Sequence, residues 1–388
     1  MLKSTVFTAA SVAAIALLSA CSTNASQGPT SALPGYAAAL PDVAAEFAYE
    51  ANEGSTNVSG YKIASDGALT PVKGSPFAAG SNPSGVAIDP TGKVAIASNA
   101  GSNNTSAFTI DATNGALTQV KGSPFGAGFA PSGVAVDSTG KFAYVANVGV
   151  SSSSNVSAYT IGSSGTLTPV KGSPFAAGTS AQYVAADPSG KFVYVPNAGS
   201  DNISAYKIAS NGALTPVKGS PFSAGSEPFG VAVDPTAKFA YVSNYGSNSV
   251  SAYTVNATSG ALAPVKGSPF AAGTEACSVI VDPNGKFIYV PNVGSANVSV
   301  YTIKSNGALI PVKGSPFAAG SGACYGAVDP SDKFVYVGNS AASSISGYQI
   351  GSNGALTPLK GSPFPAGATP AVIATCRVTS GKCIPPLL

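Results

Sequence analysis

Short runs of alternating apolar and polar residues recur along the chain, each bounded by turn-forming residues. Such runs are typical of β-strands, because successive side chains of a strand point to opposite faces of its sheet. Residues 178–222 hold one complete unit of this pattern. The unit predicts four strands, at about Tyr183–Ala186, Phe192–Pro196, 203–208 and 213–217.

Turn chemistry supports this strand assignment. Asp187-Pro188-Ser189-Gly190 predicts a tight reverse turn between the first two strands, because Asp bonds turn amides, Pro presets φ and Gly accepts a positive φ. Asn211-Gly212 predicts a hairpin between the last two strands. Pro216 lies in the fourth strand, which suits an outer edge strand whose N–H groups are unpaired.

The unit repeats along the chain. The pentapeptide KGSPF occurs seven times, at residues 73, 121, 171, 218, 266, 313 and 360, with intervals of 47 to 50 residues. A period of this length, with strands throughout, is typical of a β-propeller with one four-stranded blade per repeat. The pentapeptide then marks the passage from the outer strand of one blade to the inner strand of the next. Its Phe is expected to wedge between neighbouring blades, and its Lys to be a solvated edge charge.

The two ends of the repeat are complementary. The first unit starts at 46–52 with a strand like the second strand of the other units, and it lacks an inner strand. Residues 368–382, after the seventh pentapeptide, match an inner strand and its turn. We therefore predict an all-β, seven-bladed β-propeller over residues 39–385, with four antiparallel strands per blade. The C-terminal inner strand should join three N-terminal strands in one blade, which closes the ring.

The segments DPSGKFVYVPN, DPTAKFAYVSN, DPNGKFIYVPN and DPSDKFVYVGN resemble the YVTN-type repeats of seven-bladed propellers. The downstream SNGALTPVKGSPF resembles the bacterial lactonase family, which includes 6-phosphogluconolactonase-like and muconate-lactonising proteins. The resemblance covers residues from about 40 to 382. It implies the propeller fold, and for members acting on anionic lactones it implies Arg, His and Glu on the ligand-binding face.

Composition removes most of that expected machinery. The chain has no histidine, and its only arginine is Arg377, which adjoins the closing turn on the face opposite the expected ligand site. A Ser-His-Asp triad, a His-ligated zinc and an Arg clamp for phosphate are thus excluded. There is no tryptophan on which a quinone cofactor could stack, and neither a cofactor nor a metal is expected. The formal charge of +3 is spread along the chain, so nucleic-acid binding is not expected.

The N-terminus reads as an export signal. Lys3 precedes an apolar stretch over about 6–18, and Leu18-Ser19-Ala20-Cys21 resembles the lipobox of bacterial lipoproteins. The alternative is an ordinary signal peptide cleaved near Ala20. We predict a lipoprotein signal at 1–20, acylation of Cys21 and a flexible tether at 21–38. By the sorting rule of enteric lipoproteins, Ser22 favours the outer membrane. A lipid-anchored monomer is expected.

Candidate site residues lie where the repeats differ. In propellers, ligands usually bind on the face that carries the loops between second and third strands and the crossings between blades. Two acids stand at equivalent positions of adjacent blades, and other departures flank the same rim. The candidates are Gln182, Asp201, Glu227, Phe229, Glu275 and Tyr325. They indicate a shallow polar pocket or a weak cation site, with solvated loop residues as the alternative. The loop at 147–155 is also longer than its relatives.

The remaining four cysteines indicate disulfides in an exported chain. Cys277 and Cys324 occupy the same repeat position in consecutive blades, and Cys376 and Cys383 flank the final turn. We predict the pairs Cys277–Cys324 and Cys376–Cys383. A thiolate metal cluster is the less favoured alternative.

These observations favour a non-catalytic propeller that presents its loops to a protein, glycan or small molecule at the cell envelope. The alternative is a diverged lactonase that hydrolyses an uncharged lactone with Glu227 or Glu275 as the base.

Overall fold

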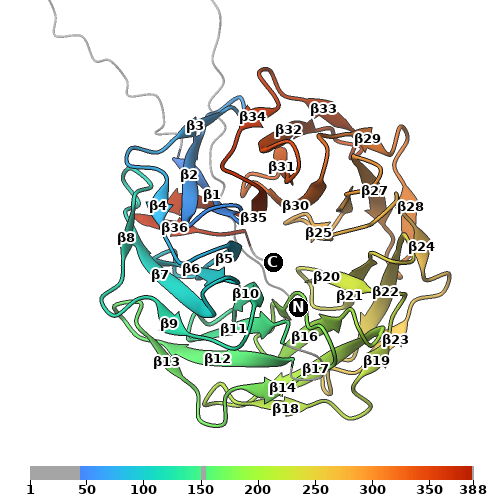
Figure 1. The fold of residues 1–388 in the computed structure, drawn as a ribbon. Helices are drawn as coiled ribbons and strands as arrows, with labels where there is room; N and C mark the ends of the chain where they lie inside the picture. Colours follow the sequence, from blue (N-terminus) through green and yellow to red (C-terminus); the bar gives the residue numbers. More distant parts are fainter. Residues whose placement is uncertain (1–43, 150–153, 387–388) are drawn as a thin grey trace, which may run out of the picture. The chain divides into compact units, whose positions relative to one another are not determined.

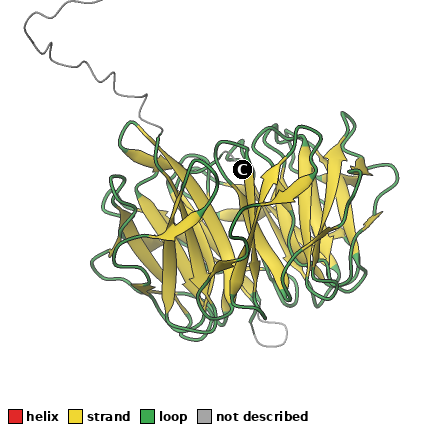
Figure 2. Ribbon diagram, turned by 90° about the horizontal axis from the view of Figure 1, so that it is seen from above, coloured by secondary structure: helices red, strands yellow, loops and turns green. Residues whose placement is uncertain are grey.

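The computed structural model describes residues 44–149 and 154–386. These residues form seven β-sheets arranged radially around a central channel (Figure 1). Strands and loops make up all of the described chain, with no helix (Figure 2). Consistent with this, no helix among the described residues is long and apolar enough to cross a membrane. The predicted signal, the tether and Cys21 lie outside the described residues, as do positions 150–153 of the long loop.

Each blade has four antiparallel strands, as predicted, and we number the blades 1 to 7 from the N-terminus. The inner strands of blades 2 to 7 and then 1 are β5 (Pro83–Ile88), β10 (Pro131–Val136), β15 (Ala185–Ala186), β20 (Pro228–Val233), β25 (Ile280–Val281), β30 (Ala323–Val328) and β35 (Pro370–Thr379). The second strands of blades 1 to 7 are β1 (Glu46–Asn52), β6 (Val94–Asn99), β11 (Phe142–Asn147), β16 (Phe192–Asn197), β21 (Phe239–Asn244), β26 (Phe287–Asn292) and β31 (Phe334–Asn339).

The outer half of each blade follows the same order. The third strands are β2 (Asn57–Ile63), β7 (Asn104–Ile110), β12 (Asn155–Ile161), β17 (Asn202–Ile208), β22 (Ser249–Val255), β27 (Asn297–Ile303) and β32 (Ser344–Ile350). The fourth strands are β3 (Leu69–Pro71), β8 (Leu117–Gln119), β13 (Leu167–Pro169), β18 (Leu214–Pro216), β23 (Leu262–Pro264), β28 (Leu309–Pro311) and β33 (Leu356–Pro358).

A short additional strand in every blade was not predicted. These strands are β4 (Phe77–Ala78), β9 (Phe125–Gly126), β14 (Phe175–Ala176), β19 (Phe222–Ser223), β24 (Phe270–Ala271), β29 (Phe317–Ala318) and β34 (Phe364–Pro365). Each starts at the Phe of KGSPF and pairs back with the third strand of its own blade before the chain crosses to the next blade. The Phe packs in the cluster shared with the next blade, as Phe77 does between blades 1 and 2.

Two inner strands, β15 and β25, are shorter than the others. In both blades the start of the inner segment still forms an isolated β-bridge to the second strand. These bridges are Ala181 with Asn197 and Ala276 with Asn292. The second strands of these two blades carry Pro196 and Pro291, where other blades carry a residue with an N–H. Because proline cannot donate to the ladder, regular pairing is interrupted beside it.

The ring closes as predicted. β35 pairs antiparallel with β1, with Phe47 opposite Cys376 and Glu46 opposite Arg377. The Arg377 Nε lies 3.0 Å from Glu46 Oε1. The chain then turns back as β36 (Lys382–Ile384), which pairs with β35. β35 thus covers the edge of β1 that would otherwise be unpaired.

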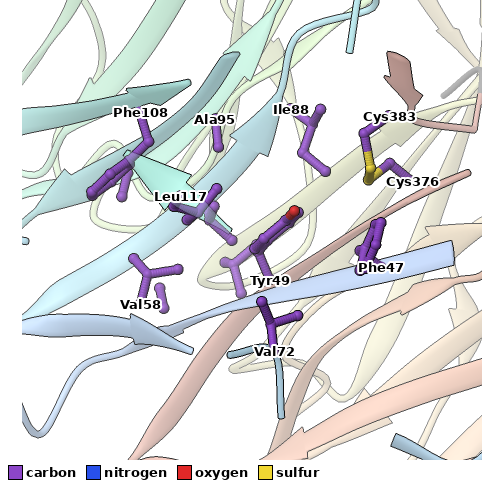
Figure 3. Packing of buried hydrophobic residues seen from close by; sticks show 14 of the residues in the cluster. Phe47, Tyr49, Val58, Val72, Ile88, Ala95, Phe108, Leu117, Cys376 and Cys383 are labelled. Atoms are coloured by element: carbon purple, nitrogen blue, oxygen red, sulfur yellow. A yellow bond between two sulfur atoms is a disulfide. The ribbon is translucent and has the colours of Figure 1, made fainter. Parts of the chain in front are cut away.

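Both predicted disulfides are present. Cys277 and Cys324 join the inner strands of blades 6 and 7, with Cα atoms 5.0 Å apart. Cys376 and Cys383 join β35 to β36. Figure 3 shows the second disulfide beside Phe47, in the apolar cluster between blades 1 and 2. No metal-binding group of three or more His, Cys, Asp or Glu occurs in the described part of the chain.

Neighbouring blades are joined by a repeated hydrogen bond. The Tyr hydroxyl of a second strand donates to a hairpin Gly carbonyl of the next blade in five of the seven blades: Tyr49 to Gly115, Tyr144 to Gly212, Tyr194 to Gly260, Tyr241 to Gly307 and Tyr336 to Gly67. Gly115 has φ +76°, and a Cβ there would lie 2.4 Å from the Phe47 ring. Only glycine therefore fits both the turn and the interface.

Candidate functional site

The candidate site lies on the loop face, which we define as the loops between second and third strands together with the crossings between blades. The described loops are 53–56, 100–103, 148–149 with 154, 198–201, 245–248, 293–296 and 340–343, and the crossings are 79–82, 127–130, 177–180, 224–227, 272–275, 319–322 and 366–369. The opposite turn face carries the Asp-Pro turns, and Arg377 lies there beside Glu46 on β1, as predicted.

Each crossing ends in a residue with left-handed backbone, immediately before the first residue of the inner segment that pairs with the second strand. Glu227 and Glu275 hold this position in blades 5 and 6, with φ of 50° and 59°. The loop of the preceding blade binds the backbone N–H of the residue. The Glu227 N–H donates to Asp201 Oδ1 at 2.8 Å, and the Glu275 N–H donates to Asn248 Oδ1 at 2.7 Å. The repeat thus holds the backbone of both acids at the rim through bonds that do not use their carboxylates.

This geometry gives Asp201 a structural role. In the loop of blade 2, Asn103 Oδ1 accepts the equivalent bond from the Ala130 N–H at 2.8 Å. An amide oxygen can therefore accept this bond as well as a carboxylate. The Asp201 carboxylate is exposed, and one oxygen is used to fix the rim of the next blade. Its remaining oxygen is the part available to a ligand.

Tyr245 lies near both rim acids. Burial raises the pKa of Tyr245 above its ordinary value, and the Glu275 carboxylate and the negative charge of Glu227 raise it further. A phenol close to two carboxylates of adjacent blades forms a polar cluster with one donor and several acceptors.

A row of aromatic rings leads from Tyr245 across the mouth of the channel. The Phe229 ring centroid lies 6.1 Å from that of Tyr245 and 6.1 Å from that of Tyr325. Tyr325 of blade 7 in turn stacks on Tyr183 of blade 4, with centroids 6.4 Å apart. These separations are typical of favourable aromatic pairs. The rings therefore form a floor beneath the loop face.

Small residues in other blades leave room for the two tyrosines. Gly85, Gly133 and Gly230 stand at the repeat position that holds Tyr183 and Tyr325. A Cβ on Gly133 would lie 2.7 Å from the Tyr183 ring. Burial raises the pKa of Tyr183 to about 12, so the phenol is protonated at neutral pH.

Glu53 adds a further acid to the rim. It opens the loop of blade 1, and its negative charge raises the pKa of Tyr325, after the larger effect of burial. Desolvation raises the pKa of Glu53 itself. Within the described loops and crossings of this face, the charged residues are Glu53, Asp201, Glu227 and Glu275, and there is no lysine or arginine.

The structure brings Glu227, Phe229, Glu275 and Tyr325 together, whereas Gln182 lies in the inner segment of blade 4, next to Tyr183. The backbone of Gln182 is used for structure: its N–H donates to the Pro196 carbonyl, and its own carbonyl accepts the Gly133 N–H. Among the described residues, the Gln182 side chain has no polar partner.

Sequence reasoning missed four residues of this face: Tyr183, Tyr245, Glu53 and the exposed Phe129. Tyr183 shares the repeat position of Tyr325. Tyr245 and Glu53 share another position, which holds Ala, Val or Ser in the remaining blades. A position-by-position comparison of all seven repeats contains both signals.

The fold and the loop-face geometry define a seven-bladed propeller with a potential ligand site above its channel. The sequence matches the family model "Lactonase, 7-bladed beta-propeller" over residues 37–181 and 153–371. The chain belongs to this family. No curated protein matches the sequence.

Several solved structures share the fold. Two are proteins provisionally named 6-phosphogluconolactonases. The one from Bacteroides fragilis is 20% identical, with a TM-score of 0.74 over 86% of this chain and 98% of that one. The one from Bacteroides uniformis is 18% identical, with a TM-score of 0.75 over 86% and 100%. The periplasmic gluconolactonase of Pseudomonas aeruginosa is 18% identical, with a TM-score of 0.73 over 85% and 99%. At these identities the likeness concerns the fold.

Proposed function

We propose that the protein is an exported binding module whose loop face captures a neutral, hydroxyl-rich ligand such as a glycan. The observation that carries the proposal is a floor of aromatic rings bordered by carboxylates, on a face with no lysine or arginine. Aromatic rings stack on the apolar faces of sugar rings, and carboxylates accept hydrogen bonds from hydroxyl groups. Without a cation, the same face disfavours phosphorylated or carboxylated ligands.

The test is calorimetric titration of the purified protein with a panel of neutral and anionic oligosaccharides. Neutral glycans should bind, and both Phe229→Ala and Glu275→Gln should weaken binding about tenfold or more, because they remove one ring and one acceptor. Asp66→Asn is the matched control, since Asp66 lies in the blade 1 hairpin on the other face, where its Oδ1 accepts the Ala68 N–H. Asn211 makes the equivalent bond in blade 4. Preferential binding of the anionic panel would contradict the proposal.

A diverged lactonase is the second candidate, favoured by membership of the lactonase family. Glu227 or Glu275 would serve as the base toward an uncharged lactone, with Tyr245 as a neighbouring proton donor. The assay is ring opening of sugar and aliphatic lactones, with the Glu227→Gln/Glu275→Gln variant beside the parent protein. Turnover that the variant loses would establish the enzyme. Glycan binding without turnover would exclude it for that panel.

We further propose that the module is anchored to the outer membrane through acylated Cys21. The support is the Leu18-Ser19-Ala20-Cys21 segment and the two disulfides, which are typical of oxidising compartments. Cys21→Ala should move the protein from the membrane fraction to the soluble fraction of exported proteins. Unchanged membrane association of that variant would refute the lipid anchor.

A further inference from the structure

Beneath the aromatic floor, the ring encloses a cavity of about 240 Å³. Its wall comes from the inner segments of all seven blades, largely valine, isoleucine and alanine. Six blades contribute an alanine at the same repeat position: Ala87, Ala135, Ala185, Ala232, Ala327 and Ala374. These small side chains leave space in the channel at this level.

Both ends of the cavity are defined. Tyr183, stacked on Tyr325, bounds it toward the loop face. Residues 384–386 of the C-terminal segment lie at the turn-face end. This segment is held by the Cys376–Cys383 disulfide and by the Cys383 N–H, which donates to the Gly92 carbonyl at 3.2 Å. The cavity is thus bounded by an aromatic ring toward the loop face, and its turn-face opening is partly covered by residues 384–386.

Charge is nearly absent from the wall. Asp187, at the turn-face mouth, is the one Asp, Glu, Lys or Arg among the lining residues. Its Oδ1 already accepts the backbone N–H groups of Lys191 and Phe192, at 2.8 and 2.7 Å. The wall therefore offers an ionic ligand no free partner, and burying an unpaired charge is costly.

We propose that this channel binds a small, uncharged, apolar molecule of one or two fused rings. An engineered apolar cavity of about 150 Å³ in another protein binds benzene, so the larger volume here admits a molecule the size of indole. Removal of apolar surface from water drives the binding. The site is separate from the loop face, because Tyr183 and Tyr325 lie between them.

The probes are indole and toluene, titrated calorimetrically into the purified full chain, with benzoate as the charged analogue. Indole should bind with a dissociation constant of about 0.1–1 mM, as expected for a ligand of this size, and benzoate at least about tenfold more weakly. Ala135→Leu and Ala232→Leu should each reduce indole affinity about tenfold, because the added side chain fills the channel. Blade 6 carries Ile280 at the same repeat position, so the fold accepts a side chain of this size there.

Three controls make the result decisive. Circular dichroism and thermal unfolding must show the leucine variants folded. Phe129→Ser and Ile310→Ser remove the two large exposed apolar side chains, and indole binding should be unchanged in both. Glu275→Gln should also leave indole binding unchanged, which separates this site from the loop-face proposal. Absence of indole binding, binding unaffected by the leucine variants, or binding lost with the surface variants would each overturn the inference.

Discussion

Glu50 in β1 is a buried carboxyl at a position that holds valine in five of the other six blades. Its Oε2 accepts the Tyr61 hydroxyl at 3.0 Å, whereas its Oε1 has no hydrogen-bond partner. Burial raises the pKa of Glu50 to about 7, against the smaller opposing effects of the Tyr61 bond and a backbone bond from Gly367. The closing blade therefore holds an acid that is most stable when protonated.

Glu50→Gln should change the pH dependence of stability. Below about pH 4.5 the carboxyl is protonated in both the folded and the unfolded chain, and it contributes no penalty. As the pH rises from there through about 7, the unfolded chain ionises first, and the folded protein loses stability up to about 3 kcal/mol. The glutamine variant should match the parent near pH 4.5 and exceed it by about 2–3 kcal/mol at pH 8.

Urea unfolding at pH 4.5, 6 and 8 measures this difference. Asp66→Asn, on an exposed hairpin, should shift the unfolding free energy by less than about 0.5 kcal/mol. A constant difference between Glu50→Gln and the parent at all three pH values would contradict the assigned role of Glu50.

Among the structural elements, the two disulfides close loops of different length. Cys277 and Cys324 are 47 residues apart, and Cys376 and Cys383 are 7 residues apart. On the chain-entropy model, the longer loop stabilises by about 4 kcal/mol and the shorter by about 2 kcal/mol. Replacing each pair with serines should thus cost more for Cys277 and Cys324. Urea unfolding of the two double variants provides the comparison, and an equal or reversed order would argue against this entropic account.

Most strands of the blades could be predicted from sequence, because the alternating pattern recurs in the repeats and every hairpin between third and fourth strands ends in glycine, after Asn, Asp or Ser. The second strand of the first unit was predicted at 46–52, and β1 has those bounds. The shortening of β15 was not predicted. It is caused by Pro196 in the neighbouring strand β16, and sequence alone does not show that the missing N–H of Pro196 would have faced β15. The two-residue strands that begin at Phe77 and its equivalents are too short to produce an alternating pattern.

The candidate site was less accessible to sequence reasoning. The Glu227 and Glu275 positions are visible as breaks in the repeat, and their shared rim follows from the period. Contact between Tyr183 and Tyr325 is not visible in this way, because blades 4 and 7 are distant in sequence and meet only across the channel. The structural use of Asp201 likewise depends on which backbone N–H faces its carboxylate.

At the scale of the whole molecule, ring closure depends on β35. Deletion of residues 368–388 would leave one edge of β1 unpaired and expose Phe47 and Tyr49, which are buried in the cluster between blades 1 and 2. We expect the truncated protein to associate through this edge and to unfold on the order of 10 °C lower. Light scattering and calorimetry test this, with deletion of residues 385–388 alone as the control. If the truncated protein is monomeric and its thermal stability is unchanged, the ring does not depend on the pairing of β35 with β1.

The repeated hydrogen bond from tyrosine to glycine also bears on how the chain finds its structure. Because Tyr144, Tyr194 and Tyr241 make the same bond to the next blade, a blade meets nearly the same surface on any other blade during folding. Wrong pairings are therefore close in energy to correct ones, and they favour kinetic traps and exchange of blades between chains. The junction of blades 7 and 1 is chemically distinct, since Glu50 lies only there. The Cys277–Cys324 disulfide likewise occurs only between blades 6 and 7. These differences between junctions favour the correct blades as neighbours.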